Sequence, residues 1–134
     1  MQELSGHELV TIGNHTQKHA IVDTLTLEEA RTEIVGAQDD IREITGSTPI
    51  GFAFPNGNYR SQDVSLLQSI GIDLAFSCEY RNNRVPEDIT GDKRLIMGRY
   101  TISGYNDLTW QSKIIRAGNS PFLLAQRLLV RSGH

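Results

Sequence analysis

Two histidines separated by three residues, His15 and His19, are the residues of this sequence best suited to chemistry. They follow a short β-prone segment, residues 9–13, and therefore lie where that predicted strand ends. Neutral imidazoles four residues apart can bind one metal ion if the segment between them makes a helical turn. The carboxyl end of a strand is also where α/β barrels place their active sites. From the spacing alone, two polar loop histidines without a ligand are the more common interpretation.

A second candidate is the segment 52–59, which reads Phe-Ala-Phe-Pro-Asn-Gly-Asn-Tyr. It begins inside a predicted strand over residues 50–54, which Pro55 stops, and Asn56 to Asn58 have the composition of a tight turn. Backbone N–H groups of such a turn, placed at the edge of a sheet, can stabilise a developing oxyanion. Taken alone, a turn with packed aromatic side chains is the more common interpretation.

The elements that position these two segments alternate between strands and helices, which favours parallel strands joined by right-handed crossovers. The best-defined helix begins after Thr26, which forms a T-x-x-E capping box with Glu29, and ends at Gly46. Four strands are few for a closed barrel, which needs about eight. The predicted strands are residues 9–13, 50–54, 72–77 and 95–102, and the later helices are 61–70, 107–117 and 121–131.

Composition excludes several classes of protein. The chain has 134 residues, enough for a single domain over residues 1–134, and a net charge of −3, which argues against a nucleic-acid binder with a basic surface. One cysteine, Cys78, excludes an internal disulfide framework. No run of 18 apolar residues predicts a transmembrane helix, and the polar first eight residues form no signal peptide, so the sequence indicates no compartment.

Taken together, the motifs resemble those of the polysaccharide deacetylases, the NodB-homology domains of carbohydrate esterase family four. The shared features are Asn14-His-Thr-Gln-Lys-His19, the capped helix, Phe52–Tyr59 and the segment Gly71-Ile-Asp-Leu-Ala-Phe-Ser77. They span about residues 9 to 103. The resemblance implies an α/β fold of the incomplete or distorted (β/α) barrel type. It also implies a metal-dependent hydrolase that removes N-acetyl groups from a polysaccharide or an N-acetylhexosamine.

The resemblance assigns roles to the histidine segment and to one later residue. His15 and His19 would be ligands of a divalent metal, usually zinc, and Thr16 would orient their loop through hydrogen bonds. The metal would polarise the acetyl carbonyl and acidify a bound water. Arg99 matches an arginine on a late strand that supports the catalytic aspartate in the family.

The resemblance also assigns roles to the proline turn. Phe54 and Pro55 would line the substrate groove, the Asn56 N–H would donate to the oxyanion, and Tyr59 would lie near the sugar. The expected partner is therefore an N-acetylated carbohydrate.

The sequence departs from the family pattern in its acidic residues. It contains no Thr-Phe-Asp-Asp motif, which supplies the base and a metal ligand in the family, so we expect an N-terminally truncated domain. Among the other carboxylates, Glu79 is the least unsuitable, because it follows a predicted strand at the correct end. Catalytic zinc normally has three protein ligands. With two histidines alone, we expect weak or no metal binding and little deacetylase activity.

These departures lead to one prediction about assembly and to two alternative functions. A barrel without its first strand exposes a parallel edge, which predicts a homo-oligomer or a swapped partner strand. The chain is alternatively a non-catalytic carbohydrate-binding relative that kept the groove and lost the base. In the third interpretation it is a structural or interaction domain in which His15 and His19 are merely polar.

Overall fold

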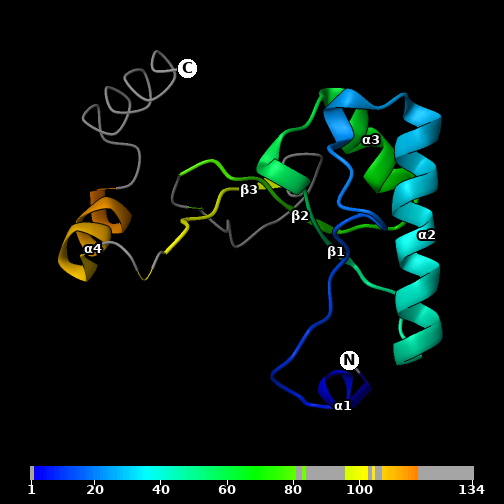
Figure 1. The fold of residues 1–134 in the computed structure, drawn as a ribbon, viewed down its shortest axis with the longest axis horizontal. Helices are drawn as coiled ribbons and strands as arrows, with labels where there is room; N and C mark the ends of the chain where they lie inside the picture. Colours follow the sequence, from blue (N-terminus) through cyan, green and yellow to red (C-terminus); the bar gives the residue numbers. More distant parts are fainter. Residues whose placement is uncertain (1, 81–82, 84–95, 103, 105–106, 118–134) are drawn as a thin grey trace, which may run out of the picture.

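A parallel three-stranded sheet is the centre of the fold, with strand order β1-β2-β3. The computed structural model describes residues 2–80, 83, 96–102, 104 and 107–117, and every structural statement below concerns these residues. Phe52 pairs with Ala75, and Ala75 with Ile96, so the three strands end at the same edge (Figure 1). In chain order the elements are α1 (Gln2–Ser5), the 3-10 turn η1 (Val22–Thr24), α2 (Leu27–Thr45), β1 (Gly51–Ala53), the 3-10 turn η2 (Pro55–Gly57), α3 (Ser61–Ser69), β2 (Leu74–Phe76), β3 (Ile96–Met97) and α4 (Leu108–Ala117).

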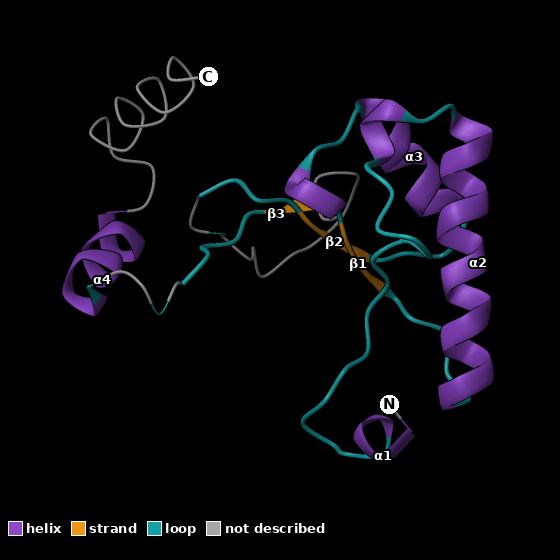
Figure 2. Ribbon diagram, viewed as in Figure 1, coloured by secondary structure: helices purple, strands orange, loops and turns teal. Residues whose placement is uncertain are grey.

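Helices α2 and α3 lie side by side on the same side of the sheet (Figure 2). Their apolar faces and the sheet enclose one core because the inward residues of each element are apolar. The sequence-based expectation of an α/β chain with parallel strands is confirmed. The core residues are Val22, Ala30, Ile34, Phe52, Phe54, Leu67, Ile72 and Ala75.

The N-terminus of α2 has the predicted capping box. The Thr26 hydroxyl accepts from the Glu29 N–H at 3.3 Å, and the Glu29 carboxylate accepts from the Thr26 N–H at 2.9 Å and from its hydroxyl at 2.7 Å. At the other end, Gly46 has φ +76° and donates its N–H to the Arg42 carbonyl at 2.8 Å. Both predicted ends of this helix are therefore confirmed.

The Thr26 hydrogen bonds lower the pKa of Glu29. A lowered pKa in the folded state means that the contact stabilises the fold fully above about pH 4.3, the usual glutamate value, and is lost as the pH falls through the lower folded value. We expect Glu29→Gln to unfold at a midpoint temperature that depends less on pH than the wild-type value does between pH 7 and pH 3. Equal pH dependence in circular-dichroism melts of the two proteins would contradict the assigned cap.

Several predicted elements are shorter in the structure or absent from it. Residues 9–13 form no strand, because only Asn14 bridges to Phe52 of β1 and Leu9 is 83% exposed. The other three strands keep only two or three paired residues each. The apolar residues Leu27 and Ile44, near the two ends of α2, are about half exposed, so the buried face of the helix is limited to its middle turns.

Other predictions lie partly or wholly outside the described residues. These are the start of the fourth strand at Leu95 and the last helix, 121–131. The helix predicted over residues 107–117 is confirmed as α4, with Asp107 Oδ1 accepting from the Thr109 N–H at 2.9 Å. None of the described helices combines the length and apolar character that crossing a bilayer demands.

Candidate functional site

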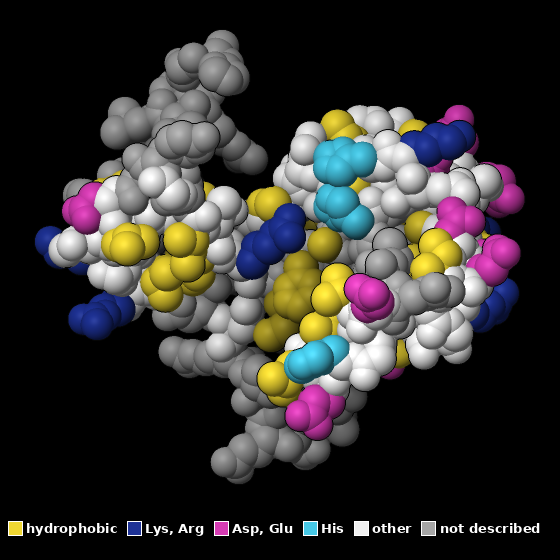
Figure 3. Space-filling model, turned by 60° about the horizontal axis from the view of Figure 1, so that its bottom comes forward, with side chains coloured by type: hydrophobic (Ala, Val, Ile, Leu, Met, Phe, Trp, Pro, Cys, Tyr) yellow, Lys and Arg dark blue, Asp and Glu magenta, His cyan; other side chains and the backbone are white. Residues whose placement is uncertain are grey.

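His15 and His19 lie next to each other on the surface, with ring centroids 4.8 Å apart and ring planes at 75°. Figure 3 shows two histidine side chains in contact on one face of the molecule. The His15 Nδ1 atom is 2.6 Å from the Ala53 carbonyl oxygen, at the end of β1. A carbonyl oxygen can only accept, so Nδ1 carries a proton and the neutral ring has its lone pair on Nε2. Metal-binding histidines are typically held in this way, by a backbone carbonyl on the other ring nitrogen.

The backbone of this histidine loop, residues 14–19, is strained at two positions. Thr16 has φ +62° and His19 has φ +57°, and among the described residues only Asn56 joins them as non-glycine residues of positive φ. A β-branched residue in the left-handed region is a marked outlier. Such strain persists only where the surroundings fix it, and it concentrates at binding and catalytic sites. All three positions belong to the two segments that the sequence singled out.

Helix α2 holds the histidine loop in place through hydrogen bonds. The Gln17 N–H donates to the Glu33 carbonyl at 3.1 Å, and the Lys18 N–H donates to the Glu33 carboxylate at 2.9 Å. The Gln17 side chain donates to Asp40 at 2.8 Å and passes close to Gly36, where an added Cβ would lie 2.9 Å from its oxygen. Gln17 and Lys18 therefore bind the helix, and His15 and His19 are left exposed.

Thr16 forms its hydrogen bond through its backbone N–H and not through its side chain. Its N–H donates to Asn14 Oδ1 at 2.9 Å. Within the described ranges its buried hydroxyl oxygen has no hydrogen-bond partner. The structure thus assigns the orientation of the loop to the Thr16 amide and to Asn14, a residue that the sequence-based set of site residues omitted although it directly precedes His15.

The proline turn follows β1 at the same edge of the sheet. The Gly57 N–H donates to the Phe54 carbonyl at 2.9 Å, and Asn56 has φ +57° and ψ −1°. These values are those of the third position of a type II turn, where asparagine or glycine is favoured after proline. Asn56 is exposed, and no described residue accepts a hydrogen bond from its N–H. That N–H can therefore donate to a bound oxygen atom.

The aromatic residues of the turn differ in exposure. Phe54 is fully buried, with Phe52 edge-on at a centroid distance of 5.0 Å and Tyr59 stacked at 5.0 Å. Pro55 is also buried, while Tyr59 is partly exposed. In this arrangement Phe54 and Pro55 hold the turn in place, and of the predicted substrate-binding residues Tyr59 offers the accessible surface.

Arg99 follows β3 at the same edge. Its guanidinium contacts Cys78 Sγ at 3.2 Å, and its backbone N–H donates to the Glu79 carbonyl at 3.0 Å. Cys78 lies in turn against Gly57, at a point where an added Cβ would be 2.8 Å from Sγ. The structure therefore connects Arg99 to the proline turn through Cys78 and shows no carboxylate partner for its guanidinium among the described residues.

The donor set fits a divalent cation only in part. His15 offers Nε2, His19 lies beside it, and the loop that carries them is held rigidly. Over the described part of the chain, no third histidine, cysteine, aspartate or glutamate joins them in a group that could hold a metal ion. The described residues therefore offer at most two of the three protein ligands that a catalytic zinc ion normally has.

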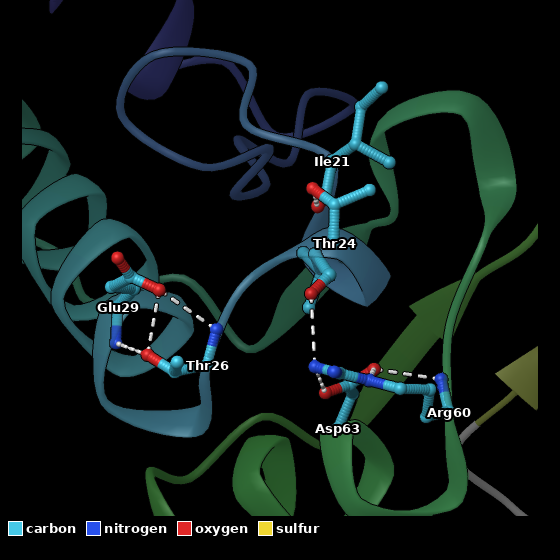
Figure 4. A network of polar contacts seen from close by, with 7 residues as sticks. Ile21, Thr24, Thr26, Glu29, Arg60 and Asp63 are labelled. Carbon is cyan, nitrogen blue, oxygen red and sulfur yellow. Dashed lines mark hydrogen bonds and ion pairs between the residues drawn. The ribbon is translucent and has the colours of Figure 1, made fainter.

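Arg60, which forms a salt bridge with Asp63, holds the segment that follows His19. Arg60 contacts Asp63 at 2.8 and 3.0 Å and also donates to the Val22 carbonyl at 3.1 Å (Figure 4). The hydrogen bonding to Asp63 raises the pKa of Arg60, and the negative charges of Asp63 and Asp23 add to the effect. Asp63 is fully buried and holds Arg60 at the N-terminus of α3, and the hydrogen bond from Arg60 to Val22 joins η1 to this end of the helix. The sequence alone predicts neither contact.

Comparison with known proteins points to one family. The family profile described as polysaccharide deacetylase matches residues 1–75. Among solved structures, the Bacillus anthracis protein BA0330 matches with a TM-score of 0.70 and 18% identity over 85% of this chain and 34% of its own. The Bacillus cereus polysaccharide deacetylase BC0361 matches with a TM-score of 0.61 and 21% identity over 78% and 32%.

A third structure, the Streptococcus pyogenes deacetylase PplD in complex with acetate, matches with a TM-score of 0.50 and 17% identity over 52% and 30%. The chain thus spans about a third of the length of these structures. No curated protein matches it. At these identities the structures support the fold, while the profile covers more than half of the chain.

Proposed function

This chain belongs to the polysaccharide deacetylase family, and from that membership we propose that it hydrolyses the acetamide group of an N-acetylated polysaccharide. In this reaction water adds to the amide carbon, the carbon–nitrogen bond breaks, and acetate and a free amine on the sugar are released. The distorted (β/α) barrel of such enzymes is part of the proposal, and the parallel sheet and the helices α2 and α3 would form a section of it.

One observation carries the proposal. The His15 and His19 rings meet at 4.8 Å, and His15 is held by the Ala53 carbonyl, two residues before Pro55. The histidine loop and the proline turn are far apart in sequence, yet this hydrogen bond holds His15 at the end of the strand that leads into the turn. That end of the strand is where parallel α/β proteins carry their chemistry.

His15 and His19 would hold a divalent cation, for which we propose zinc, together with ligands that the described residues do not bring to the pair. When bound, such an ion supplies Lewis-acid polarisation of a carbonyl and a water of lowered pKa. The protein's own residues would position the substrate. Asn56 would donate its free N–H to the acetyl oxygen, and Tyr59 would contact the sugar beside it.

Release of acetate from N-acetylglucosamine oligomers tests this function. We expect slow release in the presence of zinc or cobalt, because only part of the ligand set is at hand. His15→Ala and His19→Ala should each lower the rate by about 10- to 100-fold, the range expected when a metal site loses affinity. The substrate would be a chitin pentamer, with free acetate measured enzymatically.

His7→Ala is the matched control, because His7 is exposed and its Nδ1 accepts from the Leu9 N–H at 3.2 Å, away from the pair. Its rate should equal the wild-type rate. Release that is unchanged in His15→Ala, or no release above a metal-only blank with zinc, cobalt or manganese, would refute the proposed function.

A further inference from the structure

Asn14 is among the most buried polar residues described, with 1% of its surface exposed. Both polar atoms of its side chain form hydrogen bonds. Nδ2 donates to the Ile34 carbonyl at 2.9 Å and to Gln38 Oε1 at 3.2 Å, and Oδ1 accepts from the Thr16 N–H at 2.9 Å. The partners fix the orientation of the amide, because a carbonyl can only accept and a backbone N–H can only donate.

The Ile34 carbonyl belongs to the middle of α2, so Asn14 joins the histidine loop to the helix at a buried point. Gln38, also buried, donates its Nε2 to the Pro49 carbonyl at 3.0 Å, close to the start of β1. The Asn14–Gln38 pair therefore connects the loop, α2 and the segment entering β1. A buried network in which every group is satisfied favours one arrangement strongly, since any shift leaves a polar group without a partner.

The backbone of Asn14 continues the same network. Its N–H donates to the Gly51 carbonyl at 2.8 Å, and its carbonyl accepts from the Ala53 N–H at 2.9 Å. Ala53 in turn presents its own carbonyl to His15 Nδ1. The peptide units on both sides of His15 are thus fixed: Asn14 by β1, and Thr16 by the Asn14 side chain at a strained φ of +62°.

From these contacts we propose that Asn14 is a positioning residue for the histidine pair, acting with Gln38 to hold the strained loop that directs His15 and His19 at one cation. The inference rests on the proposed function. Without the Asn14 side chain, nothing described accepts from the Thr16 N–H, and Thr16 gains by returning to the β region. The His15 ring would then leave the Ala53 carbonyl.

Side-chain nitrogen NMR of the folded protein near pH 8 tests the proposal with and without zinc. In the wild type we expect His15 to carry its proton on Nδ1 and to respond to zinc together with His19. In Asn14→Ala, His15 should show a mixture of both tautomers, and half-saturation should need about 10- to 100-fold more zinc. Gln38→Met, which leaves Asn14 in place, should shift the zinc requirement in the same direction by a smaller factor.

Asn83→Ala is the matched control. The Asn83 side chain also binds the backbone through both of its polar atoms: Nδ2 donates to the Gly98 carbonyl at 2.7 Å, and Oδ1 accepts from the Gly98 N–H at 2.8 Å. It should lower the unfolding temperature without changing the His15 tautomer or the zinc response. The same result for a folded Asn14→Ala would overturn the proposal, and if that variant does not fold, an unchanged Gln38→Met would overturn it.

The outcomes separate this proposal from the function on which it rests. If the wild type shows no joint zinc response of His15 and His19, the proposed function fails. The tautomer of His15 still decides whether Asn14 positions the ring, because that readout needs no metal.

Discussion

Replacing Arg60 by leucine is expected to lower the midpoint of thermal unfolding by about 10 °C, because it leaves the fully buried carboxylate of Asp63 without its cation. Asp63 would keep the hydrogen bond from the backbone N–H of residue 60, at 2.7 Å, but lose those from the guanidinium. The Val22 carbonyl would lose the guanidinium as well and keep the Leu25 N–H, at 3.2 Å, as its hydrogen-bond donor. Calorimetry or circular-dichroism melts measure the effect.

The chain offers a matched control for this experiment. Arg42 and Asp39 form an ion pair with the same spacing and a similar contact of 2.7 Å, but their side chains are 60% and 55% exposed. Exposed pairs stabilise little, so Arg42→Leu should change the midpoint by no more than about 2 °C. The double variant Arg60→Leu, Asp63→Leu removes the stranded charge and should recover most of the loss. Equal effects of Arg60→Leu and Arg42→Leu would contradict the assigned role.

Replacing Gly57 by alanine is expected to lower the free energy of unfolding by about 3 kcal/mol, from two costs that add. Gly57 has φ +78°, which disfavours any side chain. An added Cβ would also lie 2.5 Å from Cys78 Cβ, 2.8 Å from Sγ and closer still to the Cys78 backbone nitrogen. Since that nitrogen cannot move alone, the proline turn must separate from the end of β2.

Gly71→Ala separates the two costs. Gly71 has a similar φ of +81°, but an added Cβ would meet nothing within 4 Å. We expect this variant to lose about 1 to 2 kcal/mol, the cost of the backbone conformation alone. If denaturant titrations show the same loss for Gly57→Ala and Gly71→Ala, the close approach of the proline turn to Cys78 is wrong.

The features predicted well from the sequence are those set by neighbouring residues. The ends of α2 follow from Thr26, Glu29 and Gly46, whose side chains or backbone freedom act within one helical turn. The turn after Phe54 follows in the same way from proline and asparagine in adjacent positions. Local chemistry decides both, so no knowledge of the tertiary structure is needed.

Features set by distant contacts were predicted poorly. The β-prone residues 9–13 did not pair as a strand, because pairing depends on a neighbour at the sheet edge and only Asn14 has one. Phe54 was expected in a substrate groove, yet Phe52 and Tyr59 enclose it. Whether an aromatic side chain meets a ligand or the core depends on the packing around it, which the pattern of residues does not specify.

The candidate site shows the same division. The family resemblance, and not the spacing alone, assigns a cation to His15 and His19, and the hydrogen bond from His15 to Ala53 depends on a contact across 38 residues. Asn14 directly follows the predicted strand 9–13, and Asp63 lies in the first turn of the predicted helix 61–70. Neither position predicts burial, so the partners that each buried side chain needs emerge only from the structure.

The most direct test of the central claim, that His15 and His19 form one cation site, is side-chain nitrogen NMR of the wild-type chain during a zinc titration. We predict that the Nε2 signals of both residues shift together and that His15 keeps its proton on Nδ1. His7 is an internal reference, because its Nδ1 accepts from Leu9 and its proton therefore lies on Nε2. A response of His7 alone, or independent responses of His15 and His19, would contradict a shared cation.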